Sequence, residues 1–501
     1  MNNILNKLKF SSFQIYILIC ICIIIFRLPF FFSDVFDWDE STYILHGQWI
    51  VDGNLTYVER TANKPPLLYY LYALFVYFSF GEIYLIRLYT CFLLLINVIY
   101  LNKIFRECFN KNFDFILITS FIFSSTFIIR DSNALFSENF AITFLLISLY
   151  YFLILKRNID FFLLGFFLSC ACLVRTHLAF LPIIIFLYLI FCLKLNLKDK
   201  LIKLLLFSFG GILVALIVFF PHLITNNINN LYNAVFVSGL SMTKSGPYSF
   251  LGTIYALLFR RSDLLNFFHY ESIFRSIFWT SSFFGFIIFF LDRRNVYKNK
   301  IIIFYLTIFF SIIIGARAFS HYLILLIPIC SIFVAYLFMH IKQNVYFFRI
   351  YFFSILICLP ISLIQYDKII KDFKVNNTFY NGPGFEIASH ASSIKDSKDT
   401  IYIYPKHIAY WFLKKYPPTD ITHPSDINKE FLFLGWGKKN SNKKNEMKKI
   451  LDTQPVYLIL DREISIFMQK FFPINSKYFK AVKSNYILDK KIGYIYIYKL
   501  D

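Results

Sequence analysis

Residues 33–67 read SDVFDWDESTYILHGQWIVDGNLTYVERTANKPPL and directly follow the first apolar run of the chain. Four acids fall within seven positions of this stretch, although only 16% of the chain is charged: Asp34, Asp37, Asp39 and Glu40. The low dielectric near a membrane disfavours charged carboxylates unless partners, water or a ligand compensate. The stretch therefore indicates chemistry, and a merely solvated loop is the alternative reading of its composition.

The rest of the chain has the composition of a helical membrane protein. Of its 501 residues, 58% are hydrophobic, and they gather in runs of roughly 17 to 25 residues, which is long enough to span a bilayer core. We predict an α-helical polytopic membrane protein. The apolar runs lie at about residues 13–32, 65–80, 83–101, 113–129, 138–155, 161–174, 178–193, 201–223, 273–291, 301–316, 320–339 and 346–364.

Charge and cysteine content narrow the class further. The formal charge of +21 sits mostly in short turns between apolar runs, which predicts membrane lipids, and not nucleic acid, as partners. The nine cysteines lie in or beside apolar runs and offer neither a disulfide framework nor a CxxC metal site. The run 13–32 follows Lys7 and Lys9 and lacks a small-residue cleavage site, so it predicts an uncleaved first helix.

The basic turns indicate which runs cross the membrane. If all twelve runs cross from a cytoplasmic N-terminus, the turns rich in lysine and arginine all fall outside, against the positive-inside rule. The conflict disappears if 65–80 does not cross, and this run opens with two prolines and contains four tyrosines, which suits the membrane interface. We therefore expect about eleven spanning helices, with 34–64 and the tail extracytoplasmic. The inverted orientation with twelve spans is the alternative, but it places Lys7 and Lys9 outside.

The tail differs from the rest of the chain, because it is polar and contains turn signals such as Gly382-Pro383-Gly384. Short apolar stretches at 400–404, 456–460 and 492–498 predict strands, and 407–416 and 442–452 predict helices. The basic run 438–449 predicts a solvated, membrane-facing surface, with an anion site as the weaker alternative. The predicted domains are therefore a transmembrane domain at 1–364, whose first extracytoplasmic loop is 33–82, and an extracytoplasmic α/β domain at 365–501.

Charged residues at the predicted outer ends of the spans are candidates for a site. Acids that meet Arg, Lys and His at one membrane depth suit a phosphate-bearing lipid and a hydroxyl that must lose a proton. Each residue alone can also be explained without a functional role. Arg27 would then extend its charge to the membrane interface, and Glu138 would cap the helix that begins there. The set is Arg27, Asp34, Asp37, Asp39, Glu40, Lys64, Arg130, Asp131, Glu138, Arg175, His177, Arg317 and His321.

A series of motifs runs through and beyond the acidic stretch. Its residues are, in order, Asp39, Glu40, Tyr43, Gly53, Lys64 to Leu67, Gly81 and Arg87-Leu88. This order is similar to the first extracytoplasmic loop of GT-C superfamily glycosyltransferases, among them the protein O-mannosyltransferases, the lipid A aminoarabinose transferases and the bacterial RgtA/B/C/D-like group. The resemblance covers about residues 20–180 and extends more weakly to His321-Tyr322 and Pro328.

The resemblance implies roles for individual residues. Asp39 would be the base or essential carboxylate, supported by Glu40 and Tyr43, and Lys64 would lie near the donor phosphate. Glu138 takes roughly the place of the second acid of these families, with Asp131 as its rival. Arg175 and His177 match the family less closely, and together with Arg27 and His321 of the outer charged set they are further candidates for binding the donor phosphate. Asn63 stands where the aminoarabinose transferases carry a glutamate, so a metal site of their type is not supported, and the cofactors stay open.

Together these features predict an inverting glycosyltransferase of a bacterial plasma membrane. It would move a hexosyl or pentosyl group from a polyprenyl-phosphate donor to an extracytoplasmic lipid, glycan or protein, with Asp39 taking the acceptor proton and Lys64 stabilising the phosphate. An O-antigen polymerase or ligase stays open, since the long loop 224–271 suits one. A lipid-linked sugar flippase or transporter is the other alternative, although no inverted repeat is present.

Overall fold

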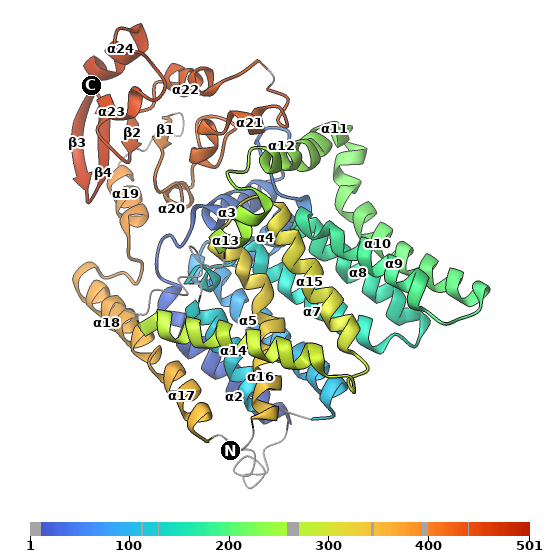
Figure 1. Cartoon of the computed structure of the whole chain (residues 1–501). Helices are drawn as coiled ribbons and strands as arrows, with labels where there is room; N and C mark the ends of the chain where they lie inside the picture. The colour runs from blue at the N-terminus through green and yellow to red at the C-terminus, as the bar shows by residue number, and fades with distance from the viewer. Residues whose placement is uncertain are drawn as a thin grey trace. The chain divides into compact units, whose positions relative to one another are not determined.

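The computed structural model describes residues 12–111, 114–128, 130–257, 270–341, 345–392, 399–438 and 440–501 (Figure 1). The chain forms two compact units, each built from three separate stretches of sequence. Unit 1 comprises Met1–Phe31, Ile83–Val218 and Gly246–Asp367. Unit 2 comprises Phe32–Glu82, Phe219–Ser245 and Lys368–Asp501.

Seven helical segments of the described residues are long and apolar enough to cross a membrane, by length and composition. The predicted fold class is therefore confirmed, while the predicted number of about eleven spans stays a prediction. The elements of these segments are α2 (Ser12–Arg27), α5 (Ile83–Phe109), α7 (Ser137–Ile154), α10 (Leu197–Ile224), α14 (Tyr270–Leu291), η7 with α16 (Ser320–Leu326, Ile327–His340) and α17 with α18 (Val345–Leu356, Leu359–Asn376).

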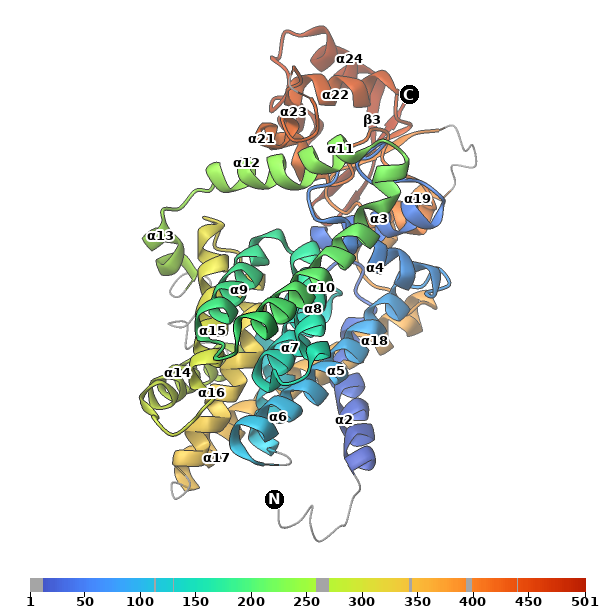
Figure 2. The same ribbon diagram turned by 90° about the vertical axis from the view of Figure 1, so that its right-hand side faces the viewer.

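Unit 1 is a helical bundle with α16 at its core. Almost every residue of η7 and α16 is buried, and α16 packs against α14 and α6 (Phe115–Phe123). Where α8 (Asn158–Val174) meets α10, a Cβ on Gly165 or Gly210 would collide with a backbone carbonyl of the other helix. Small residues allow such close approach of apolar helices. The other helices of the bundle are α9 (Phe180–Cys192), α13 (Phe250–Tyr255) and α15 (Lys298–Ile314), as Figure 2 shows.

Irregular turns interrupt the helices of unit 1 at several of the predicted site residues. A π-helical turn, η2 (Ser124–Ile128), is followed by the 3₁₀ turn η3 (Arg130–Asn133), and η4 (Thr176–Ala179) joins α8 to α9. Together with η7 these turns hold Asp131, His177 and His321. Such turns are frequent at functional sites, because they re-aim side chains that a regular helix would direct elsewhere.

Unit 2 begins with two short helices, α3 (Trp38–Val51) and α4 (Pro66–Tyr77), which pack against each other. Helix α4 has 12 residues, so it is about 18 Å long and falls short of the ~30 Å hydrocarbon core. This length agrees with the prediction that 65–80 does not cross. The central stretch of the unit adds α11 (Ile228–Tyr232), η5 (Asn233–Val237) and α12 (Ser238–Lys244).

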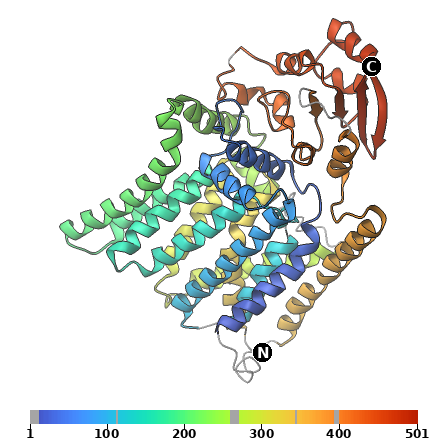
Figure 3. The same cartoon turned by 180° about the vertical axis from the view of Figure 1, so that it is seen from behind.

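The tail contributes a four-stranded sheet to unit 2 (Figure 3). The order of its strands is β1-β2-β4-β3. Strand β1 (Ile401–Ile403) runs parallel to β2 (Tyr457–Leu460), and β2 and β3 (Tyr486–Ile492) both pair antiparallel with β4 (Ile495–Leu500). The remaining elements are α19 (Pro383–Ala391), α20 (Ala409–Leu413), η8 (Pro424–Asn428), α21 (Glu430–Phe433), α22 (Lys443–Asp452), α23 (Ile464–Met468) and α24 (Lys477–Asn485).

The predicted small α/β domain is confirmed in kind, and three of its strands lie where the sequence indicates. Strand β3 was not predicted, because five of its seven residues are exposed and three of them are charged. Charged side chains are typical of edge strands, where they prevent pairing with another chain.

The acidic stretch is held within unit 2 by contacts with the tail. Thr61 forms a parallel bridge with Ile421, and the indole of Trp436 donates a hydrogen bond of 3.1 Å to the carbonyl of Ala62. Trp38 packs against the apolar core under the sheet. The stretch and the tail therefore share one folded unit.

One prediction about the tail needs correction. Within the basic run 438–449, Lys438 is not part of a solvated surface, because its Nζ binds Asp420 Oδ1 at 2.8 Å and Glu446 Oε2 at 2.9 Å. Glu446 is buried and also binds Lys449, at 2.8 Å. A buried carboxylate needs such charged partners. Lys439 lies outside the described residues.

Candidate functional site

Asp39 lies in the first turn of α3, and the local sequence explains this position. Asp37 is the N-cap of the helix, and its Oδ1 accepts the backbone N–H of Asp39 at 2.7 Å. Aspartate is among the preferred N-cap residues, because it satisfies an N–H that the helix leaves unpaired. The carboxylate of Asp39 therefore stands at the positive end of a helix, which stabilises its charged form.

Two predicted residues lie beside this carboxylate. The hydroxyl of Tyr43 donates to Asp39 Oδ2 at 2.9 Å, from one helical turn further along α3. Lys64 Nζ lies 3.6 Å from the same oxygen. Tyr57 anchors the lysine's backbone, since its hydroxyl donates to the Lys64 carbonyl at 2.5 Å. The Asp39 side chain stays 26% exposed, so a ligand can reach it.

A histidine of the tail, which the sequence did not single out, completes this arrangement. His423 Nε2 lies 3.6 Å from Asp39 Oδ1, and Nδ1 lies 3.6 Å from Asp426 Oδ1. Ser425 Oγ is 3.0 Å from Nδ1. Burial lowers the pKa of His423, although the two aspartates oppose this shift. A neutral imidazole between two carboxylates can pass a proton between them.

A second tail histidine lies behind the first. The ring of His407 is 5.5 Å from that of His423, and both lie near the indole of Trp38, which precedes Asp39. Thr42 Oγ1 and His407 Nε2 share a hydrogen bond of 2.9 Å. Burial lowers the pKa of His407 well below its usual value. The only sequence signal for the pair was two histidines 16 positions apart in a polar tail.

The remaining acids of the opening stretch are buried or hold backbone in place. The carboxylate of Asp34 accepts the N–H of Val35 at 2.7 Å and also binds the N–H of Gly384. Gly382 has φ +122°, and a Cβ there would collide with the Asp34 carboxylate. Glu40 is only 1% exposed. Of the four acids, Asp39 is thus the one that combines exposure with a lysine partner.

A second cluster lies in unit 1, around the other predicted acid. Glu138 is fully buried in the first turn of α7, where it forms an ion pair with Arg175 and accepts the Ser137 hydroxyl at 3.0 Å. His321 Nε2 lies 3.7 Å from Glu138 Oε1. The guanidinium of Arg175 also lies 4.8 Å from the centre of the Tyr322 ring. Three of the predicted residues therefore meet here.

The other predicted residues of unit 1 differ in their surroundings. The ring of His177 lies 5.5 Å from that of Tyr322, at the edge of the Glu138 cluster. Arg27 is buried, and its Nε donates to Asn133 Oδ1 at 3.0 Å while Nη2 binds the backbone carbonyls of Ser125 and Ser132. These contacts join the end of α2 to the irregular turns. Asp131 lies in η3, and its side chain is outside the described part of the structure.

Within the residues that the structure describes, no set of three or more His, Cys, Asp or Glu side chains is arranged to hold a metal ion.

Comparisons with known proteins agree on one fold. A family model described as dolichyl-phosphate-mannose-protein mannosyltransferase matches residues 63–225. The crystal structure of ArnT from Cupriavidus metallidurans bound to undecaprenyl phosphate matches with a TM-score of 0.64 at 10% identity, over 97% of this chain and 98% of that one. The oligosaccharyltransferase of Archaeoglobus fulgidus tethered with an acceptor peptide matches with a TM-score of 0.54 at 11% identity, over 96% and 72%. No curated protein matches the sequence.

The fold therefore defines a multi-pass membrane protein with a small α/β element in its tail. The family model over residues 63–225 and the fold shared with the two solved structures make the chain similar to membrane glycosyltransferases of the GT-C superfamily. The predicted resemblance to this superfamily is confirmed.

Proposed function

We propose that the chain transfers a sugar from a polyprenyl-phosphate-linked donor to an extracytoplasmic acceptor. The observation that carries this proposal is the exposed Asp39 carboxylate, which contacts Tyr43 and Lys64 at the start of α3. The relative ArnT was crystallised with undecaprenyl phosphate, which supports a lipid phosphate as the leaving group.

Asp39 would act on the acceptor. The acceptor oxygen attacks the anomeric carbon, the bond from that carbon to the phosphate oxygen breaks with its electron pair, and the hydroxyl proton passes to Asp39. The transfer to Asp39 does not require a strong base, because the hydroxyl becomes acidic only as it bonds to the electron-poor carbon. A single displacement inverts the anomeric configuration.

Lys64 would stabilise the leaving group, and His423 would accept the proton from Asp39. An ammonium next to the reacting centre stabilises the charge that grows on the phosphate in the transition state. His423 lies next to the other oxygen of Asp39 and offers a path by which the proton leaves for solvent.

The Glu138 cluster is proposed as a group that binds lipid phosphate. Arg175 offers a bidentate donor set, and His177 and His321 lie near it. Because Glu138 neutralises Arg175 in the present arrangement, we expect it to tune the affinity for phosphate and not to bind the donor itself. Arg27 would act indirectly, by holding the turn that contains Asp131.

The test is transfer in proteoliposomes with a polyprenyl-phosphate sugar and an acceptor extract. We expect Asp39→Asn to abolish transfer and Lys64→Met to lower kcat about 10²- to 10³-fold, while Lys64→Arg retains most activity. Arg175→Lys should raise the KM for the donor. Thermal unfolding of each variant serves as the folding control, and near-normal transfer by Asp39→Asn would refute the role of this residue. Passage of the intact sugar lipid across the bilayer without transfer would identify a flippase instead.

We also propose that the N-terminus is cytoplasmic and that residues 33–82 and 365–501 are extracytoplasmic, in a bacterial plasma membrane. The basic turns of unit 1 support this orientation through the positive-inside rule. A cysteine introduced at Lys480, an exposed tail position, should react with a membrane-impermeant maleimide in intact cells. A cysteine at Arg157, in a basic turn, should react only after the cells are permeabilised, and the reverse result would invert the topology.

A further inference from the structure

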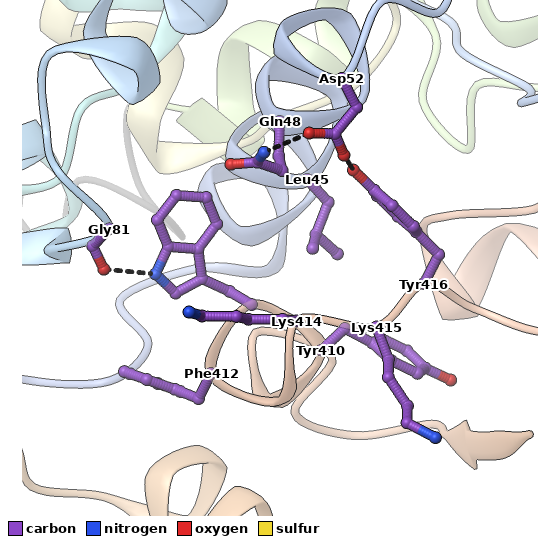
Figure 4. A pocket seen from close by; sticks show the side chains of 10 residues that line it. Leu45, Gln48, Asp52, Gly81, Tyr410, Phe412, Lys414, Lys415 and Tyr416 are labelled. Carbon is purple, nitrogen blue, oxygen red and sulfur yellow. Dashed lines mark hydrogen bonds between the residues drawn. The ribbon is translucent and has the colours of Figure 1, made fainter. Parts of the chain in front are cut away.

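A pocket in unit 2 opens on a different face of α3 from the one that carries Asp39. Its volume is about 460 Å³, which lies within the usual range for small-molecule sites. Leu45, Gln48 and Asp52 line it from α3, at the spacing of residues on one helix face. The opposite wall is the segment 410–416 at and after α20, with Gly81 at one end (Figure 4).

Aromatic rings form much of this opposite wall. Trp411 is fixed by a 3.2 Å hydrogen bond from its Nε1 to the Gly81 carbonyl, and Phe412 lies next to it in the pocket lining (Figure 4). Tyr416 is held from behind by the guanidinium of Arg60, 4.7 Å from its ring centre. Rigid aromatic faces beside polar groups suit ligands that are apolar on one face and polar at their edges.

The α3 wall supplies hydrogen-bonding groups. Gln48 Nε2 donates to Asp52 Oδ1 at 2.6 Å, and the Tyr416 hydroxyl donates to Asp52 Oδ2. An amide and a carboxylate on successive turns present several acceptor lone pairs and the second amide hydrogen. Groups of this kind, opposite aromatic rings, recognise the hydroxyls of a sugar whose C–H face stacks on the rings.

Two lysines add positive charge at the lip of the pocket. Lys414 is exposed and adopts a left-handed backbone conformation with φ +52°, at the C-cap of α20. A left-handed residue is a common way to end a helix, and here it turns the chain at the edge of the pocket. Figure 4 shows the Lys414 side chain beside the rings of the opposite wall. Lys415 lies next to it and donates to the Asp399 carbonyl at 2.8 Å.

We propose that this pocket binds a saccharide that carries an acidic group. Its rings would stack on Trp411 and Phe412, its hydroxyls would bind Gln48 and Asp52, and its carboxylate or phosphate would face Lys414. This inference rests on the proposed function, because it identifies the saccharide as part of the acceptor. Gln48 lies nine positions after Asp39 in α3, a rise of about 14 Å. The bound sugar would therefore be recognised at a distance from the reacting hydroxyl.

The test measures binding, so that it does not depend on transfer. Full-length protein in nanodiscs is applied to an array of bacterial oligosaccharides that includes uronate-bearing, phosphate-bearing and neutral members. We expect acidic saccharides to bind, and both Phe412→Ala and Lys414→Glu to weaken that binding by at least about tenfold, which corresponds to ~1.4 kcal/mol. The matched control is Lys480→Glu, which makes the same charge change at an exposed position of α24 and should leave binding unchanged.

The outcomes separate this inference from the proposed function. Asp39→Asn should bind the saccharides as the wild type does, even if it transfers nothing. The proposal is overturned if the wild type binds no saccharide of the array, if it binds neutral and acidic members equally, or if the two pocket variants bind as the control does. If Asp39→Asn loses transfer but still binds the saccharides, the result concerns only the proposed catalytic role of Asp39 and leaves the pocket proposal intact.

Discussion

His46 lies in the middle of α3 with a fully buried imidazole, 4.7 Å from the ring of Tyr69. Burial and the nearby charge of Arg60 lower the pKa of His46 to about 3. The folded protein therefore holds this histidine neutral under conditions in which the unfolded chain protonates it. Its contribution to stability is complete above about pH 6.5 and is lost progressively as the pH falls towards 3.

We predict that His46→Leu makes stability less dependent on pH. The variant removes a group that the unfolded chain protonates and the folded chain does not, so the fall in Tm between pH 7 and pH 4.5 should become shallower. The measurement is thermal unfolding of the purified protein in detergent across this range. His407, whose pKa burial also lowers, remains in the variant and should leave a residual slope. An unchanged slope would show that His46 does not control this loss.

At the scale of single residues, the sequence predicted Asp39, Tyr43 and Lys64 because they follow one another in one motif. It did not predict His423, which reaches Asp39 only through the folding of a distant loop. Proximity of this kind depends on tertiary structure, and neither spacing nor composition encodes it. For Glu138 and Arg175, the sequence predicted only a similar depth in the membrane and not the ion pair between them.

Helix α3 is the element on which the proposed chemistry depends, and its N-cap can be tested. Asp37→Ala removes the side-chain acceptor for the Asp39 N–H, so the first turn should fray and the carboxylate should lose its position. We predict a loss of about 1 kcal/mol in the free energy of unfolding, together with a marked loss of transfer.

A second cap in the same unit provides the matched control. Asn442 is the N-cap of α22 and accepts the N–H of Asn445 at 2.9 Å. Asn442→Ala should lower stability by a similar amount and leave transfer nearly unchanged. Equal loss of transfer in both variants would mean that activity follows overall stability and not the position of Asp39.

Among the elements, long apolar helices and apolar strands were predicted well, because hydrophobic patterning determines them. Short and irregular elements were not. Within the predicted run 113–129, the described residues form an α-helix, Phe115–Phe123, and then a π-helical turn, Ser124–Ile128. Such a change of hydrogen bonding leaves no signature in the apolar pattern of a sequence. The edge strand β3 was missed because its exposed residues resemble a polar loop.

At the scale of the whole molecule, the acidic stretch and the tail behave as one folding unit. Arg60 donates to the carbonyls of Thr419 and Pro417 at 3.1 and 3.4 Å, and Trp38 covers part of the apolar core of the tail. A fragment of residues 368–501 alone would expose this core and leave these carbonyls without their donor.

We therefore predict that the fragment 368–501 is unstable alone and is stabilised by a peptide of residues 32–82. Limited proteolysis and circular dichroism, with and without the peptide, provide the measurement. The control is the same peptide carrying Arg60→Ala and Trp38→Ala, which should stabilise less. A fragment that resists protease equally well without any peptide would contradict this prediction.

Unit 2 combines segments that lie far apart in the sequence, and this affects how the chain can fold during its synthesis on the ribosome. Thr61 and its partner Asp420 are separated by 359 positions, and translation proceeds at about 5 to 20 residues per second. The acidic stretch must therefore wait for roughly 20 to 70 seconds after its own synthesis before its partner segment exists. During that interval the side chains that pack on the tail, Trp38 among them, lack their native partner surface. The native packing of this segment can therefore be completed only after the last quarter of the chain has emerged.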